Sequence, residues 1–281
     1  MKRLARTLAA LGLAVPFACA AHAFAVAEAE PEGETADPNP PGLLDMHYDF
    51  YVGGLPIAEI DLSGTISPEG YTASTSVVTR GILELLVAGR VTAQATGYRR
   101  PYGHLAPDAY ATDYSTRSET RSVQISYDGA SPEAVAIEPP EDAESFAADA
   151  ADAEGALDPV TAAVMLMMPG ERDLLCNRTI PVFDGKRRYD IVLLPISRRP
   201  AGDEPPALEW AAPTVRCFGI YERIAGFEEE LQTEQRYYPF DVWFEAEAVS
   251  GAGGEALYRA VRIAGNTSLG FAIGNLRGSD G

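Results

Sequence analysis

The sequence has few of the residue types that most hydrolytic and metal sites require. It contains three histidines, and two of them, His47 and His104, lie outside the N-terminal segment described below. The Gly-x-Ser-x-Gly, His-Glu-x-x-His and Cys-x-x-Cys motifs and the phosphate-binding P-loop are all missing. The chain therefore has too few histidines to favour a histidine-based triad or a zinc site. We expect no enzyme activity, no catalytic residues, no metal and no cofactor, and we interpret each histidine as an ordinary strand or loop residue.

Positive charge is also scarce. The chain has 22 Lys and Arg against 41 Asp and Glu, which gives a net charge of −19. Binding to nucleic-acid phosphates needs basic stripes, so no nucleic acid is expected as a partner. The simplest interpretation of the acidity is solubility and solvated loops. The basic cluster at 186–188 is interpreted as a solvated hairpin tip, and contact with an anionic headgroup or partner is the alternative.

Long apolar runs are missing after the N-terminus, so no transmembrane segment is expected in the mature chain. The first six residues contain three cations, residues 8–18 are apolar, and Ala21-His22-Ala23 fits a cleavage site. This pattern predicts a signal peptide over residues 1–23, cleaved near Ala23, and a periplasmic location. Loss of the three cations lowers the net charge from −19 to −22.

The chain has only three cysteines, and cleavage would remove Cys19. A lipid anchor on Cys19 is the alternative, although the bulky Phe17 near the cleavage site fits it poorly. Cys176 and Cys217 remain, and an oxidising compartment favours a disulfide between them over two free buried thiols. The bond would join positions 41 apart and would stabilise the fold by roughly 4 kcal/mol in the loop-entropy model.

Period-two alternation predicts a mainly β fold. Residues 58–66 alternate between apolar and polar side chains, as a half-buried antiparallel strand does. Asp184-Gly185 lies between two alternating runs, which predicts a hairpin with a type I′ turn. Further strands are predicted at 47–52, 71–80, 90–98, 105–116, 121–127, 238–246, 257–264 and 268–276.

The predicted organisation is one β domain over 44–281 that follows a flexible acidic leader over 24–43. The leader is acidic and rich in proline, with almost no bulky apolar residue. A second acidic stretch, 139–156, is predicted to be a loop, and 203–207 another. About ten or more short strands with few helices indicate an antiparallel sheet, curled or closed into a barrel to protect its edges.

The firmest helix prediction begins at Asp158-Pro159, because Asp is a good N-cap and proline suits the first helical position. It ends before Pro169-Gly170 and has no polar face. Such a helix is either buried core or lines an apolar cavity, and its methionines suit adaptable lipophilic surfaces. We also expect one or two helical turns at 81–89. The candidate ligand-binding residues on the main helix are Val160, Val164, Met165, Met167 and Met168.

Four stretches together resemble a family of proteobacterial envelope proteins, the domain of unknown function 3108. The stretches lie at 48–59, 157–162, 183–190 and 217–227, and the resemblance runs from about Leu44 to the C-terminus. It implies an exported protein without assigned catalytic residues. At the level of architecture it is similar to lipoprotein-carrier half-barrels and periplasmic β-spiral envelope proteins, in which a long sheet wraps one apolar helix.

Three functions remain open from the sequence. The first is a periplasmic half-barrel whose concave face holds a lipophilic ligand, an acyl chain or a lipoprotein. The second is an envelope-integrity protein with a packed interior that acts through an envelope protein partner. The third is an enzyme that uses acidic residues, for which the spacing selects no particular pair.

Overall fold

The computed structural model describes residues 42–86, 88–101, 104–129, 131–140, 146–168, 171–198, 214–229, 233–250, 256–267 and 269–278. All of them belong to one compact unit, Asp37–Gly281. The signal peptide with Cys19 and Ala23, the leader up to residue 41, the helix stop at 169–170 and the loop at 203–207 lie outside these ranges. The predictions about them stay predictions.

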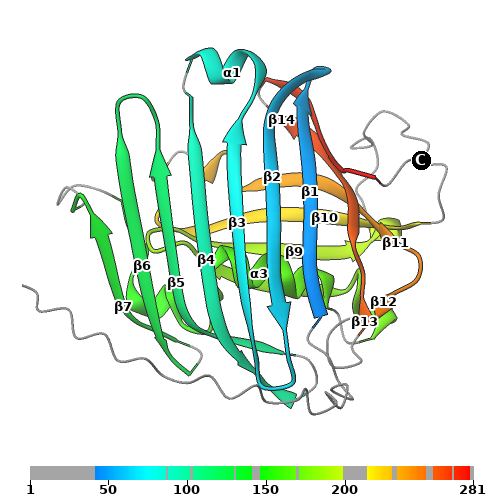
Figure 1. Ribbon diagram of the computed structural model, residues 1–281, viewed down its shortest axis with the longest axis horizontal. Helices are drawn as coiled ribbons and strands as arrows, with labels where there is room; N and C mark the ends of the chain where they lie inside the picture. Colours follow the sequence, from blue (N-terminus) through cyan, green and yellow to red (C-terminus); the bar gives the residue numbers. More distant parts are fainter. Residues whose placement is uncertain are drawn as a thin grey trace, which may run out of the picture. The chain divides into compact units, whose positions relative to one another are not determined.

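One antiparallel sheet of 13 strands forms the body of the unit (Figure 1). Its order is β7-β6-β5-β4-β3-β2-β1-β15-β14-β11-β10-β9-β8. The strands are β1 (Gly42–Val52), β2 (Leu55–Ile66), β3 (Gly70–Thr79), β4 (Arg90–Arg99), β5 (Leu105–Ser115), β6 (Thr120–Asp128), β7 (Ser131–Glu138), β8 (Arg178–Phe183), β9 (Arg188–Pro195), β10 (Thr214–Ala225), β11 (Tyr237–Glu245), β14 (Ala260–Thr267) and β15 (Gly270–Leu276). A separate short ladder pairs β12 (Val249–Ser250) with β13 (Ala256–Leu257).

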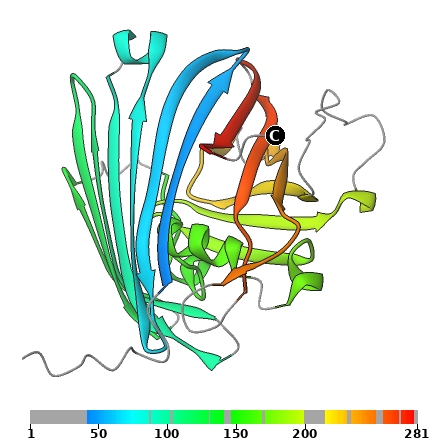
Figure 2. The same cartoon turned by 45° about the vertical axis from the view of Figure 1, so that its right-hand side comes forward.

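The sheet is curled and not closed. Strands β1 to β6 stand side by side, and β9 and β10 cross behind them at a steep angle (Figures 1 and 2). A twisted open sheet of more than about ten strands generally curls. The β8–β9 hairpin reaches the inner side of β6, since a Cβ built on Gly185 would lie 2.4 Å from Cγ1 of Val123. The predicted curled antiparallel fold is therefore confirmed, in its open form.

Alternation along the first strands separates the two faces of the sheet. On β1, Leu44, Met46 and Tyr48 are buried, whereas Asp45 and His47 between them are exposed. The apolar face is the concave one and packs into the main core, and the polar face is solvated. The predicted strand at 47–52 begins earlier, at Gly42, because the same alternation extends back to the start of the described chain.

The predicted apolar helix is α3 (Pro159–Met167), and it lies within the curl between β1–β6 and the crossing strands (Figure 2). Asp158 caps it: its Oδ1 accepts hydrogen bonds from the backbone N–H groups of Val160 and Thr161, at 3.0 and 2.9 Å. Leu157 hydrogen-bonds the backbone of β8 just before the cap. The helix therefore starts where the sequence places it, joined to the sheet at its first turn.

The predicted disulfide joins Cys176 to Cys217, with Cα atoms 5.2 Å apart. Cys176 follows η2 (Arg172–Leu174) and precedes β8, whereas Cys217 is fully buried in β10. The bond links the two ends of the β8–β10 unit. A second apolar cluster packs around Cys217, and its buried members include Leu175, Leu193 and Phe244.

Two predictions need correction. The acidic stretch 139–156 contains a short helix, α2 (Ala150–Ala153), in which Asp149 and Asp152 form a capping box. The buried Ala153 packs into the main core and gives this helix a tertiary anchor. The β8–β9 hairpin is present, but its loop is not a type I′ turn. Only Gly185 has a positive φ there, and Asp184 accepts hydrogen bonds from the backbone N–H groups of residues 186 and 187.

Candidate functional site

The five candidate residues of α3 lie in the interior. Val160, Val164, Met167 and Met168 are at most 5 % exposed and belong to the main core cluster. Met165 is half-buried, and its Sδ lies 3.3 Å from the backbone nitrogen of Leu105 on β5. The side chains of α3 therefore cover the part of the concave face that lies next to the helix.

A buried polar network anchors α3 to the sheet. The Thr161 hydroxyl donates to Oδ2 of Asp158 at 2.5 Å, and the Tyr71 hydroxyl of β3 lies 2.5 Å from the Thr161 oxygen. Burial raises the pKa of Asp158 to about 6, although four hydrogen bonds oppose the rise. The hydroxyl of the nearby buried Tyr127 has no hydrogen-bond partner within the described ranges.

Beyond α3 the concave face becomes more accessible. Phe50, Ile60, Val77 and Val91 belong to its apolar side and are half-buried. Ile60 is paired with Val77 and Val77 with Val91, so three of them form one cross-strand row. The Phe50 ring lies over Gly274 of β15, where a Cβ would come within 2.5 Å of the ring. We call these four residues the concave strip.

The concave strip has a defined position relative to α3. Further along β2 and β4, away from α1 (Gly81–Leu86), the same face carries the buried Leu62, Ala93 and Ala95. Contacts of α3 with β4 explain the burial of the two alanines. The strip lies towards α1, at the other end of the strands, where burial is incomplete. It therefore presents apolar surface that the protein's own helix does not fully cover.

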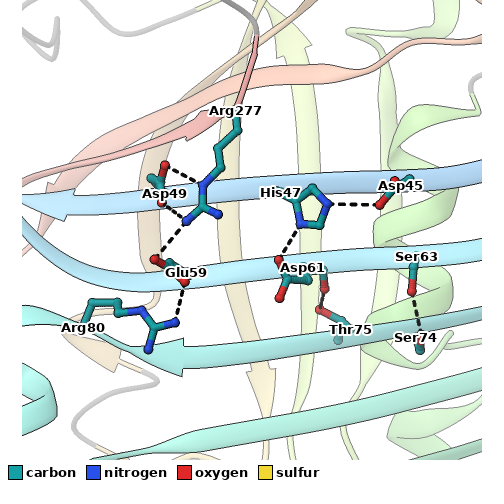
Figure 3. Close-up of polar contacts among 10 residues, drawn as sticks. All are labelled: Asp45, His47, Asp49, Glu59, Asp61, Ser63, Ser74, Thr75, Arg80 and Arg277. Atoms are coloured by element: carbon teal, nitrogen blue, oxygen red, sulfur yellow. Dashed lines mark hydrogen bonds and ion pairs between the residues drawn. The ribbon is translucent and has the colours of Figure 1, made fainter.

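The outer face carries a ladder of charged side chains across β1 and β2 (Figure 3). Nδ1 of His47 lies 2.6 Å from Asp61, and its Nε2 lies 3.1 Å from Asp45. The hydrogen bond to Asp61 raises the pKa of His47. Arg277 contacts both Asp49 and Glu59, at 2.6 and 2.9 Å. Such cross-strand pairs stabilise a sheet.

This ladder lacks the geometry of a nucleophile site. Both ring nitrogens of His47 contact carboxylates, so neither is directed at a hydroxyl. Ser63, on the neighbouring part of β2, instead shares a hydrogen bond of 3.0 Å with Ser74 across the strands. Among the described residues no three His, Cys, Asp or Glu side chains are grouped to hold a metal ion.

Two shallow hollows also lie on the outer face, with volumes of about 480 and 350 Å³. Both include Gln94 and Ala111, so they adjoin. Small and polar side chains such as Ser63, Ser74 and Thr92 line the smaller one. Alanines, Ile125 and Val135 line most of the larger one.

Comparison with known families identifies the chain at the family level. The model of the family "Protein of unknown function (DUF3108)" matches residues 46–199, more than half of the 281 residues. The chain belongs to the DUF3108 family. No curated protein matches this DUF3108 protein. A solved structure, a β-barrel-like protein of the domain of unknown function DUF1849 from Brucella abortus, is similar at 12% identity and a TM-score of 0.44, over 85% of this chain and 97% of that one.

Sequence reasoning found the helix of this DUF3108 protein but missed the concave strip. The composition of α3 could not show that its side chains would be covered by β3, β4 and β5. In the sequence, the residues of the concave strip cannot be distinguished from other inward-facing residues of alternating strands. The signal that could have found them is geometric, because strands of about ten residues are longer than the nine-residue helix that they enclose.

The described part of this DUF3108 protein contains no helix long and apolar enough to cross a membrane. The arginines of the basic cluster at 186–188 have different neighbours. Arg188 pairs with Asp190 at 2.7 Å, whereas the Arg187 guanidinium lies 5.7 Å from the centre of the Phe227 ring. The cluster is therefore not one basic patch.

Proposed function

We propose that this DUF3108 protein is an exported, non-catalytic binding protein of the cell envelope. It holds a lipophilic ligand, such as an acyl chain, against the concave strip. The observation that carries the proposal is the half-buried state of Phe50, Ile60, Val77 and Val91, beside the buried Leu62, Ala93 and Ala95 on the same face. The signal-like residues 1–23 support export.

Physical chemistry favours an apolar ligand at this place. Apolar surface left in contact with water gains about 25 cal/mol per Å² when a ligand covers it. Ligand sites are generally concave and apolar with few polar groups, and the strip is contributed by neighbouring strands of a curled sheet. In this arrangement α3 is the floor of the site, and its methionines lie below the ligand.

A pair of adjacent substitutions tests the proposal. In Val77→Glu a carboxylate enters the concave strip, whereas in Val78→Glu the same change lies on the opposite face of β3, in register with Arg90. We expect titration with a dansyl-labelled fatty acid to show binding by the wild-type protein. Val77→Glu should weaken that binding about tenfold or more, and Val78→Glu should change it little.

Thermal unfolding followed by circular dichroism would verify that both variants fold. Native mass spectrometry of gently purified protein should also detect a bound lipid. The proposal fails if the wild-type protein binds no fatty acid. It fails equally if folded Val77→Glu and Val78→Glu bind the probe alike.

A second function is favoured by a different observation, the burial of α3. Because Val160, Val164, Met167 and Met168 are covered by the protein itself, an envelope protein that acts through protein partners with a packed core is also consistent with the fold. Crosslinking in cells should then recover a specific envelope protein neighbour. Recovery of such a neighbour, together with no bound lipid, would favour this function over the first.

A further inference from the structure

Exposed apolar side chains gather at the α1 end of the sheet. Twelve large hydrophobic side chains are exposed among the described residues, and five of these lie on three turns at this end. They are Leu55 (60 %), Ile82 (57 %), Leu85 (71 %), Leu86 (69 %) and Leu269 (79 %). We call these five residues the apolar rim. Figures 1 and 2 both show α1 beyond the ends of β3 and β4, near the β1–β2 turn.

Backbone contacts hold the turns of the rim next to one another. The β14–β15 turn meets the β1–β2 turn through a hydrogen bond of 3.0 Å from Gly53 N–H to the carbonyl of Phe271. The β1–β2 hairpin meets the start of α1 through a bond of 2.8 Å from Arg80 N–H to the carbonyl of Ile57. The three turns of the rim are therefore adjacent, although they are distant in sequence.

The base of α1 is fixed although its apolar side chains are not buried. Thr79 and Gly89 exchange hydrogen bonds across the base, at 3.0 Å from Thr79 N–H and 2.9 Å to the Thr79 hydroxyl. Gly81 has a φ of +57°, and a Cβ there would lie 2.5 Å from the carbonyl oxygen of Pro56. The Arg117 guanidinium donates to the carbonyl of Glu84 at 3.2 Å. These contacts thus fix α1 in place although none of its residues is buried.

The charge around the rim differs from that of the chain as a whole. Arg80, Arg90 and Arg117 lie on the segments that carry α1 and on the β5–β6 turn. The acidic residues at this end are Glu84, Glu119 and Glu59, and Glu59 pairs with Arg80 at 2.6 Å. Three arginines and three glutamates make this end locally neutral, in a chain with a net charge of −19. Arginines beside exposed leucines match a surface with phosphates outside and hydrocarbon beneath.

We propose that the apolar rim docks on a phospholipid bilayer surface. Its leucines and isoleucine enter the acyl region, and Arg90 and Arg117 contact lipid phosphates. The five side chains protrude from separate turns, and a fluid bilayer can close around each of them. This docking goes beyond ligand binding and does not depend on the concave strip, although it would bring the open end of the strip close to the membrane.

The experiment is sedimentation of the purified mature protein with vesicles of phosphatidylethanolamine and phosphatidylglycerol. We expect the wild-type protein to bind. The double variant Leu85→Asp/Leu86→Asp should bind more weakly by about tenfold or more per leucine, because each loses the burial of one apolar side chain. The matched control is Leu43→Asp/Tyr98→Asp, which adds the same charge at exposed positions at the other end of β1 and β4 and should bind like the wild type.

The outcomes separate this proposal from the others. All four positions are exposed, so thermal unfolding should differ little among the proteins. Val77→Glu should lose fatty-acid binding but keep vesicle binding. The proposal is overturned if the wild-type protein does not sediment with vesicles, or if both double variants bind equally. It is also overturned if sedimentation velocity shows a dimer that only Leu85→Asp/Leu86→Asp disrupts, since the rim would then join two copies of the chain.

Discussion

Removing the Cys176–Cys217 disulfide is expected to lower the free energy of unfolding by about 4 kcal/mol. The bond closes a loop with a sequence separation of 41, so its loss frees many conformations of the unfolded chain. Urea unfolding of the Cys176→Ser/Cys217→Ser variant, followed by circular dichroism, would measure the change. Wild-type protein in reducing agent should likewise unfold at a lower urea concentration than the oxidised protein.

The loss of the disulfide must be distinguished from the change in packing at position 217. Cys217 is fully buried beside Leu193 and Phe244, so a serine there adds the cost of burying a hydroxyl. The Cys217→Ala/Cys176→Ala variant controls for that cost. If reduction of the wild-type protein leaves its unfolding midpoint unchanged, the bond does not contribute as expected.

Replacing Asp158 by alanine is expected to cost about 3 kcal/mol. The substitution removes the acceptor for two backbone N–H groups of α3 and for the Thr161 hydroxyl, and Asp158 is fully buried. Loss of an N-cap costs about 1 kcal/mol, and each donor left unsatisfied in the core adds about 1–3 kcal/mol. The matched control is Asp149→Ala, which removes the exposed N-cap of α2 and should cost about 1 kcal/mol or less.

The same carboxyl group gives a pH dependence with a defined sign. Because burial raises the pKa of folded Asp158 from 3.8 to about 6, the folded state binds this proton more tightly than the unfolded chain does. The contribution of this group to stability is then greatest below about pH 4 and falls by about 3 kcal/mol as the pH rises to about 6. Asp158→Asn cannot ionise, so the difference in unfolding free energy between it and the wild type should change over this interval. A constant difference would contradict the raised pKa.

Some elements could be predicted from the sequence because they depend on interactions between residues close together in the chain. Asp158-Pro159 specifies the start of α3 through a side-chain cap and a preset φ, both of which act within one turn. The alternation in β1 and β2 likewise reports the two faces of a sheet. The pairing of Cys176 with Cys217 followed from their number, since the predicted cleavage leaves only two cysteines.

Other features depend on contacts that no local pattern encodes. The helix at 150–153 forms in an acidic stretch because Ala153 reaches the core, which is a tertiary effect. The loop after Asp184 is longer than a type I′ turn because the Asp184 side chain bonds to the backbone that follows it. The concave strip and the apolar rim depend on how far α3 and the turns extend along the sheet. Their residue types resemble those of any inward strand position or short apolar helix.

The order of the sheet has a consequence for how the molecule is completed. β15 is inserted between β1 and β14, so one long edge of the first-made strand has no neighbour until residues 270–276 have been synthesised. The half containing β1 to β7 can therefore form early, but it must wait for the last segment of the chain before the two halves join. During that interval a bare strand edge is open to pairing with another nascent chain. Shielding of this edge by a chaperone should thus matter more for the yield of native protein than the speed at which the first half folds.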